Sequence, residues 1–422
     1  MTLNAHIIRQ QFPALHGASP NSTVSPVFFD NPAGTQVPQQ VIESVADYYR
    51  TMNANSGGFF ATSQRSDAMV YATRQKAAAF LNAARPEEIA FGPNMTTLNF
   101  SLSRALAKTL RPGDEIVLTR MDHDANVAPW LLIAQDHGLV VRWVDIRHED
   151  ATLDMNTLEA ALTDRTKIVA TVHASNAVGT INPVAQIAQM AHAAGAFYVV
   201  DAVQSAPHVL IDVQQMGCDF LLCSAYKFFG PHIGVLWGKY DLLAQLPVYK
   251  VRPSKDTPPY RWESGTMSFE TIAGVGAALD YIASLSGDNV VQGCDDLRAV
   301  FVQAMANLHK YEQALVAHLI PMLQGIPGLH IYGITAENRY EERVPTVVFS
   351  LQGHTSEAVA DYLAQHDIYV WHGNYYAVEI MNRLGHSRDG LVRVGLVHYN
   401  THEEIDRLEA ALRALVGGAA GV

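Results

Sequence analysis

The sequence has little that would cross-link the chain, hold it in a membrane or export it. Cysteine occurs only three times in 422 residues, at Cys218, Cys223 and Cys294, with neither disulfide nor metal-site spacing. No stretch reaches the roughly eighteen consecutive apolar residues of a membrane span. Residues 1–6 lack the basic and apolar segments of an export signal. These absences predict a cytoplasmic protein with no membrane partner.

Charge is also scarce, and its balance is acidic. Only 17% of the residues are charged, 49% are hydrophobic, and the formal net charge is -12. No basic run interrupts this balance, so we expect no nucleic-acid partner. The 18 histidines are scattered without metal-ligand spacing, so we expect no metal. A chain of this length and hydrophobic content can bury the cores of two domains.

Lys227 is the most informative residue of the sequence. It follows an apolar run, residues 220–222, with Ser224 just before it and Gly230 just after it. A lone lysine near a strand end is usually a solvated surface charge. A lysine delivered to the mouth of a buried strand, however, is placed to form an imine with a carbonyl compound.

Polar side chains also follow three earlier apolar runs. Residues 197–200 end in Asp201, residues 167–173 lead to Asn176, and residues 115–119 lead to His123. Because the carboxyl ends of parallel strands meet at one edge of an open α/β sheet, these groups can share a site with the lysine.

The region between Thr96 and Gly238 alternates short β-rich runs with helical patterns. This alternation predicts right-handed crossovers and a mainly parallel sheet. The expected strands are residues 115–119, 140–146, 167–173, 197–201, 220–224 and 233–238, and the expected helices include residues 97–110 and 184–194.

After Gly238 the pattern changes to that of a smaller α+β domain. A loop rich in proline and charge, residues 250–259, comes first, and residues 417–422 read as a frayed tail. We expect a large domain at residues 26–268 and a small one at residues 1–25 and 269–422. The expected helices of the second part are residues 271–285, 296–325, 356–366 and 402–415, and the expected strands are residues 345–350, 368–371 and 391–394.

The ordered set of site residues resembles the class V aminotransferases. The resemblance covers about residues 30–407 and is closest to the branch of group II cysteine desulfurases and selenocysteine lyases. It rests on Asp201 with Gln204, Ser224 with Lys227, His123 with Asn126, Asn176 before Gly179 and Thr180, and Arg393. The resemblance implies a fold-type I transferase that uses pyridoxal 5'-phosphate, acts on a small-molecule amino acid and forms a homodimer.

The resemblance assigns a role to each residue near the cofactor ring. Lys227 would form the imine and then, once freed, move the Cα proton. Asp201 would hold the pyridine nitrogen, Gln204 would bind the 3-oxygen, and His123 would stack on the ring and handle protons. Without the resemblance, Asp201 could be a turn residue, Gln204 a helix-start residue and His123 a surface residue.

A phosphate site is expected where residues 92–97 open a helix, because hydroxyls and backbone amides gather there. Thr96 would bind through its side chain, and Met95 and Thr97 through backbone groups.

Three more residues complete this expected cradle. Ser224 would bind from the other side, and Tyr226 stands where the nearest relatives carry histidine. The segment with Gly265 and Thr266 resembles one that reaches the phosphate of the neighbouring subunit, which is why we expect a dimer.

Arg393 interrupts an apolar strand, and its planar fork suits a substrate α-carboxylate. A structural ion pair is the alternative. Asn176 is expected to contact the same carboxylate or the 3-oxygen, whereas Asn182, before Pro183, is expected to cap a helix.

The sequence departs from the desulfurases in the loop 371–378. These enzymes use a loop thiolate to attack the sulfur of the substrate, and Tyr376 stands at the cysteine position. A phenol forms no persulfide. We expect the three cysteines to be structural, Tyr369 and Trp371 to be ordinary strand residues, and the substrate pocket to be shaped by His372, Asn374, Tyr375 and Tyr376.

Three functions remain open from the sequence. The first is Cα deprotonation followed by amino transfer or by elimination at Cβ, as in a C–S lyase. The second is desulfuration or selenocysteine cleavage without the loop cysteine, with epimerisation through Tyr376 or His123 as a variant. The third is cofactor binding without turnover.

Overall fold

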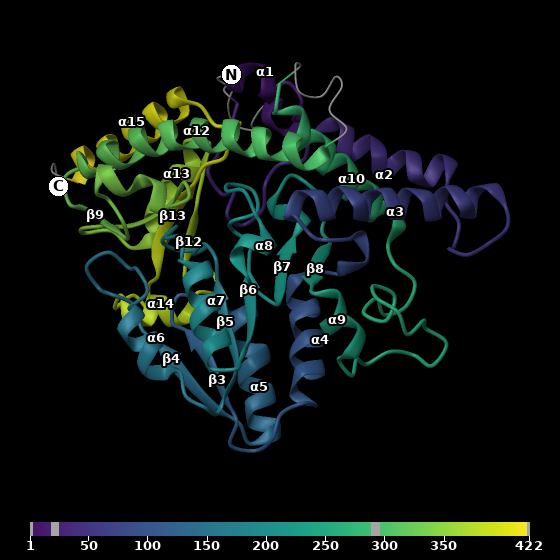
Figure 1. Cartoon of the computed structure of the whole chain (residues 1–422). Coiled ribbons are helices and arrows are strands. Elements are labelled where there is room, and N and C mark those ends of the chain that lie inside the picture. Colours follow the sequence, from purple (N-terminus) through teal and green to yellow (C-terminus); the bar gives the residue numbers. More distant parts are fainter. Residues whose placement is uncertain (1–2, 18–24, 288–295, 420–422) are drawn as a thin grey trace.

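A seven-stranded sheet forms the centre of the fold, in the order β2-β8-β7-β6-β5-β3-β4. The computed structural model describes residues 3–17, 25–287 and 296–419 (Figure 1). The strands are β2 (Ile89–Gly92), β3 (Glu115–Thr119), β4 (Val140–Val144), β5 (Thr166–Val172), β6 (Phe197–Asp201), β7 (Phe220–Ser224) and β8 (Gly234–Gly238). Neighbouring strands are parallel except at β8, which runs antiparallel to β7 and β2. The expected α/β class with a mainly parallel sheet is confirmed.

Helices cover this sheet, so its central strands are buried along almost their whole length. The amino-terminal helices are α1 (Ala5–Arg9), α2 (Gln39–Thr51) and α3 (Ala61–Leu81). The helices that follow are α4 (Met95–Ala107), α5 (Ala128–His137), α6 (Met155–Ala161), α7 (Val184–Ala193), α8 (Val213–Met216), α9 (Tyr240–Gln245) and α10 (Phe269–Ser284). Short 3-10 turns lie at Pro13–His16, Pro86–Glu88, Asp124–Asn126, Ala225–Lys227 and Glu337–Glu342.

A second, antiparallel sheet has the order β12-β13-β10-β9. Its strands are β9 (Leu329–Tyr332), β10 (Thr346–Leu351), β12 (Trp371–Gly373) and β13 (Leu391–Gly395), and the nearby helices are α12 (Leu297–Gln324), α13 (Ser356–Gln365), α14 (Val378–Arg383) and α15 (His402–Ala419). The single strand expected at residues 368–371 is wrong. It is divided because β11 (Ile368–Tyr369) pairs with β1 (Val27–Phe28), whereas β12 pairs with β13.

Helix α12 connects the two halves of the molecule and runs along one side of both in Figure 1. Its first part, with Phe301 and Leu308, lies in the hydrophobic core of the large sheet. Its later part, with Leu315 and Leu323, lies in the core of the small sheet. Helix α10 packs against α2 and α3. The division of the chain at residue 268 stays a prediction.

The cap expected of Asn182 is wrong. The backbone before α7 has Pro183 at the cap position with no side-chain hydrogen bond. Asn182 is buried and its Nδ2 donates to the carbonyl of Val172, at 2.8 Å. Its side-chain amide therefore donates a hydrogen bond to the last carbonyl of strand β5 and does not cap the start of the helix.

Within the described ranges, no helix is both long and apolar enough to cross a membrane. The same part of the chain contains no cluster of histidine, cysteine and acidic side chains suited to a metal ion.

A buried ion pair ties α3 to the segment that carries Thr266. The side chains of Arg74 and Glu263 are 4% and 3% exposed, and their closest N–O distance is 2.7 Å. Glu263 also accepts a hydrogen bond from the backbone N–H of Phe91, at 2.9 Å. The carboxylate therefore links a helix, a strand and this loop.

We predict that Glu263→Ala lowers the free energy of unfolding by about 3 kcal/mol, because it leaves a buried guanidinium without its counter-charge. Urea denaturation measures the change. The matched control is Asp280→Ala, which removes the exposed partner of Lys76 and should cost less than about 1 kcal/mol. Equal losses in the two variants would contradict the prediction.

Candidate active site

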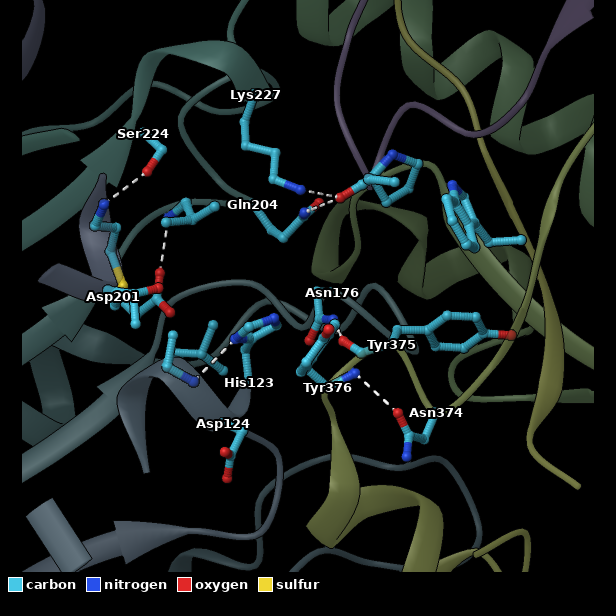
Figure 2. A pocket seen from close by; sticks show the side chains of 18 of the residues that line it. His123, Asp124, Asn176, Asp201, Gln204, Ser224, Lys227, Asn374, Tyr375 and Tyr376 are labelled. Carbon is cyan, nitrogen blue, oxygen red and sulfur yellow. Dashed lines mark hydrogen bonds between the residues drawn. The ribbon is translucent and has the colours of Figure 1, made fainter. Parts of the chain in front are cut away.

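A cavity of about 980 Å³ opens where the carboxyl ends of the parallel strands meet the small sheet. Figure 2 shows its polar side chains converging from both halves of the chain. Fourteen of the expected site residues line it: Met95, Thr96, His123, Asn176, Asp201, Gln204, Ser224, Tyr226, Lys227, His372, Asn374, Tyr375, Tyr376 and Arg393. Thr97 and Thr266 lie outside its wall. The role of each residue stays a prediction.

Lys227 closes the 3-10 turn that follows β7, and it is 8% exposed. Its Nζ donates to the carbonyl of Pro32 at 2.5 Å, and Gln204 Nε2 donates to the same oxygen at 2.7 Å; both bonds are visible in Figure 2. Burial, together with Arg393, lowers the pKa of Lys227 to about 7. Near neutral pH much of this amine is therefore uncharged and nucleophilic.

Asp201 is buried at the end of β6, on the cavity wall. One of its oxygens accepts the backbone N–H of Val203 at 2.9 Å. Burial raises the pKa of Asp201 to about 6, while the Val203 bond and the charge of Lys227 favour the ionised form. A cationic ring nitrogen is the kind of partner that stabilises such a carboxylate.

His123 begins the short turn Asp124–Asn126, and its Nδ1 accepts the backbone N–H of Ala125 at 3.0 Å. This bond places the ring proton on Nε2. Burial, with smaller contributions from Lys227 and Arg393, lowers the pKa of His123 to about 4. The ring is therefore neutral at physiological pH, as suits an imidazole stacked on a cofactor.

The start of α4 lies on the cavity wall, where the sequence predicts a phosphate site, and this role stays a prediction. The backbone N–H of Met95 donates to Ser224 Oγ at 3.0 Å, and Thr96 is exposed on the wall. The backbone N–H of Thr97, however, donates to Asn94 Oδ1 at 2.8 Å. The cap role of Asn94 was not predicted from the sequence, although an asparagine just before a helix is a strong cap signal.

Arg393 lies on β13, buried, with its guanidinium carbon 4.3 Å from the centroid of the Tyr375 ring. Its Nη1 donates to the backbone carbonyl of Asn176 at 2.9 Å. In the described part of the chain no carboxylate lies within ion-pair distance of it, so the alternative of a structural ion pair does not hold. Burial lowers the pKa of Arg393 to about 10, so it remains cationic. Arg393 Nε and Asn176 Oδ1 are both buried without hydrogen-bond partners.

Asp30 is a second residue whose place near the site was not predicted from the sequence. It precedes Pro32, forms a bridge to Gly395, and has one buried carboxyl oxygen without a hydrogen-bond partner. Burial raises the pKa of Asp30 to about 6, against the charges of Arg393 and Lys227. Only a short apolar run precedes Asp30 in the sequence, so no strand-end pattern marks it.

The loop with Tyr375 and Tyr376 crosses from the small sheet to the large one. The backbone N–H of Asp124 donates to the Tyr376 carbonyl at 2.7 Å, and Asn176 Nδ2 donates to the Tyr375 carbonyl at 3.0 Å. Both tyrosines have left-handed backbones, with φ of 53° and 56°. The Tyr376 side chain is 71% exposed, and its ring centroid lies 5.6 Å from that of His123, an arrangement visible in Figure 2. Two such residues in sequence store strain, which is typical of functional loops.

The remaining expectations on this region have mixed outcomes. Cys218 and Cys223 are buried away from the wall, and burial raises the pKa of each thiol, as expected of structural cysteines. Cys294 lies outside the described residues. Tyr369 packs against Phe28 as an ordinary strand residue. Trp371 does not fit that description, because it is half-exposed on the cavity wall.

The sheet order, the strand-end carboxyl and the buried lysine define the class of pyridoxal-phosphate enzymes with this α/β fold. The family model of the class V aminotransferases matches residues 27–308 and 296–408. The chain therefore belongs to the class V aminotransferase family and is a pyridoxal-phosphate-dependent enzyme.

Two relatives that are similar over nearly the whole chain are named cysteine desulfurases. A cysteine desulfurase of Pectobacterium atrosepticum is 33% identical over 97% of this chain and 97% of its own. One from Escherichia coli O9:H4 is 30% identical over 98% of this chain and 99% of its own.

Two solved structures of cysteine desulfurases have a similar fold over nearly the whole chain. An apo cysteine desulfurase of Thermococcus onnurineus has a TM-score of 0.86 at 26% identity, covering 99% of this chain and 100% of its own. The cysteine desulfurase CsdA of Escherichia coli, with an S-sulfonic acid, has a TM-score of 0.83 at 26% identity over 99% of both chains.

The residues of the cavity fit the cofactor of this family. An amine with a lowered pKa, a carboxyl at a strand end and a neutral imidazole line the cavity, and an exposed hydroxyl lies at the start of a helix, where phosphates bind. The unpartnered Nε of Arg393 can donate a hydrogen bond to a bound carboxylate or cofactor oxygen, and the unpartnered Oδ1 of Asn176 can accept one from a bound N–H or O–H group.

We predict that cofactor attachment to the apo-protein speeds up as the pH rises from 6 to 8. The pKa of Lys227 is lowered to about 7, so the protonated amine dominates below this pH and the reactive neutral amine dominates above it. Borohydride reduction at timed intervals, followed by mass spectrometry, measures the attachment.

Lys227→Ala should abolish the reducible adduct. Lys239→Ala, which removes a half-exposed lysine paired with Asp219, is the control and should keep the pH profile. A flat profile, or an adduct on another lysine, would contradict the assignment of Lys227.

Proposed function

We propose that this enzyme removes the Cα proton of an amino acid with sulfur on Cβ and expels that sulfur as a thiol. For a thioether substrate, the amino acid and one water give the free thiol, pyruvate and ammonium. The C–S bond breaks with its electron pair leaving on sulfur, which takes up a proton. The reaction needs no oxidant and no protein thiol.

The residues of the cavity support each part of this proposal. When bound, pyridoxal phosphate supplies a carbonyl carbon that condenses with amines and a ring that accepts electrons released at Cα. Arg393 binds the α-carboxylate through its planar fork, and Asn176 adds an amide contact. Lys227, whose pKa is lowered to about 7, takes the Cα proton in its neutral form, and Asp201 holds the ring nitrogen protonated.

The main support for the proposal is the set of functional groups that line the cavity. The described residues that line the cavity include amine, imidazole, phenol and guanidinium groups but no thiol. The two described cysteines are buried, and burial raises their pKa, so neither supplies a thiolate nucleophile. The relatives are named cysteine desulfurases, which supports sulfur removal as the reaction.

A second candidate is cysteine desulfuration as the names of the relatives describe it. That reaction converts cysteine to alanine and passes the sulfur to an acceptor. The high coverage of these relatives favours it, while the thiol-free wall does not. Amino transfer and epimerisation both leave the sulfur on the substrate, so product analysis separates them from either candidate.

We also propose that the active unit is a homodimer in which Thr266 reaches the phosphate of the neighbouring subunit. Thr266 is exposed and lies outside the cavity of its own chain. Trp262 and Glu263, just before it, are buried and hydrogen-bonded, so the loop has a fixed base. The large domain would span residues 26–268.

We predict that the enzyme converts S-alkyl-L-cysteine to pyruvate, ammonium and thiol in equal amounts, and that replacing Cys218, Cys223 and Cys294 by serine preserves this turnover. Chromatography of the keto acid and thiol measures both. Alanine as the main product from L-cysteine, with loss of turnover in a folded triple variant, would favour the thiol mechanism instead.

We predict that Arg393→Ala raises KM at least about tenfold for substrates with an α-carboxylate, since a buried charge-assisted contact is lost. The same change should affect plain amines, which lack this group, much less. Arg393→Lys keeps the charge without the planar fork, so its KM for these acids should lie between the values of the unmodified enzyme and of Arg393→Ala. Initial rates at several substrate concentrations measure the effect, and equal losses with acids and amines would remove Arg393 from this role.

A further inference from the structure

Arg388 lies on the wall of the active-site cavity, at its exposed end. The loop that carries it runs from Gly385 to Gly390, both with positive φ. The backbone N–H of Gly390 donates to the carbonyl of His386 at 3.0 Å. Ser356 Oγ donates to the carbonyl of Asp389 at 2.5 Å. These bonds fix the backbone at the base of the loop, and Arg388 extends from it on the exposed part of the cavity wall.

The guanidinium of Arg388 has no ion-pair partner among the described residues. Two arginines outside the cavity wall have acidic partners: Arg383 pairs with Asp145, and Arg120 with Glu379. Among residues 3–17, 25–287 and 296–419, no side chain or carbonyl forms an ion pair or hydrogen bond with Arg388. An unpaired arginine on the wall of a substrate cavity suits an anionic ligand group.

The two guanidinium groups of the wall lie at different depths. Arg393 is buried on β13, whereas Arg388 is exposed at the mouth. The cavity volume, about 980 Å³, is at the upper end of the range of pockets that hold drug-sized ligands. A cofactor and a small amino acid leave part of this space open toward the mouth. The substrate side chain therefore has room to extend beyond its sulfur.

We infer that the substrate carries a second carboxylate at the far end of its sulfur substituent, and that Arg388 binds this group. The inference rests on the proposed function, since it specifies the substrate of the same site. Arg393 takes the α-carboxylate, and Arg388 takes the distal one through its planar fork. Trp371 and Tyr376, both on the wall near the mouth, supply apolar surface for the carbons between.

One acidic group on the wall limits where this carboxylate can lie. Asp124, half-exposed, comes from the large-sheet side, and its charge repels an anion. Arg388 comes from the small-sheet side. The distal carboxylate therefore binds on the side of the small sheet, and the position of Arg388 determines the length of substituent that fits.

The test compares two thioethers of equal length, S-(2-carboxyethyl)-L-cysteine and S-propyl-L-cysteine. We expect kcat/KM to favour the acid about tenfold, and Arg388→Gln to bring this ratio to about one. Arg413→Gln, which changes an exposed arginine paired with Glu409 on α15, should leave the ratio as it is. A ratio near one in the unmodified enzyme, or a preference that survives Arg388→Gln, overturns the inference.

A binding experiment separates this inference from the proposed function. L-2-aminopimelate and L-2-aminoheptanoate have the same lengths as the two thioethers but no leaving group on Cβ. Their dissociation constants, from the change in cofactor absorbance, should differ about tenfold in the unmodified enzyme and become similar in Arg388→Gln. If neither thioether is cleaved but this binding difference appears, the proposed function fails and the role of Arg388 stands. If the binding constants are equal, the role of Arg388 fails.

Discussion

The site depends on the cost of keeping an ammonium group out of water. Lys227 is almost fully buried, and its hydrogen bond to the Pro32 carbonyl replaces only part of the solvation it would have at the surface. Its pKa therefore falls to about 7, and the amine becomes a nucleophile at physiological pH. Burial acts in the opposite sense on the neighbouring carboxyls, Asp30 and Asp201, whose pKa values both rise to about 6. One closely packed region thus holds acids and a base whose proton affinities lie close together.

The sequence predicted the large sheet well because its strands are short, apolar and each followed by a polar side chain. Strands β3, β6 and β7 have the expected bounds, and the residues at their ends line one cavity. The direction of β8 could not be predicted, since a buried run of apolar residues has the same pattern in either direction. Asp30 was missed for a related reason: its position beside Lys227 depends on how segment 30–34 packs, which no local pattern records.

The small sheet and the loop above the site were harder to predict. Residues 368–371 form one apolar and aromatic run in the sequence, yet the run divides between two different partners, β1 and β13. Pairing partners that are distant in sequence leave no periodic signal. The left-handed backbones of Tyr375 and Tyr376 are similarly unexpected, because glycine or asparagine usually occupies such positions. These two tyrosines are held by hydrogen bonds from Asn176 and Asp124, residues more than a hundred positions away.

Helix α12 has a mechanical consequence for the enzyme. Its 28 residues make a rod about 42 Å long, with one end embedded in each core. The two halves of the molecule cannot turn freely about each other without bending this rod or repacking one of its ends. Opening of the substrate entrance should therefore come from small movements of the loops at the cavity mouth. Slow motions of the two halves relative to each other should change the width of the entrance little.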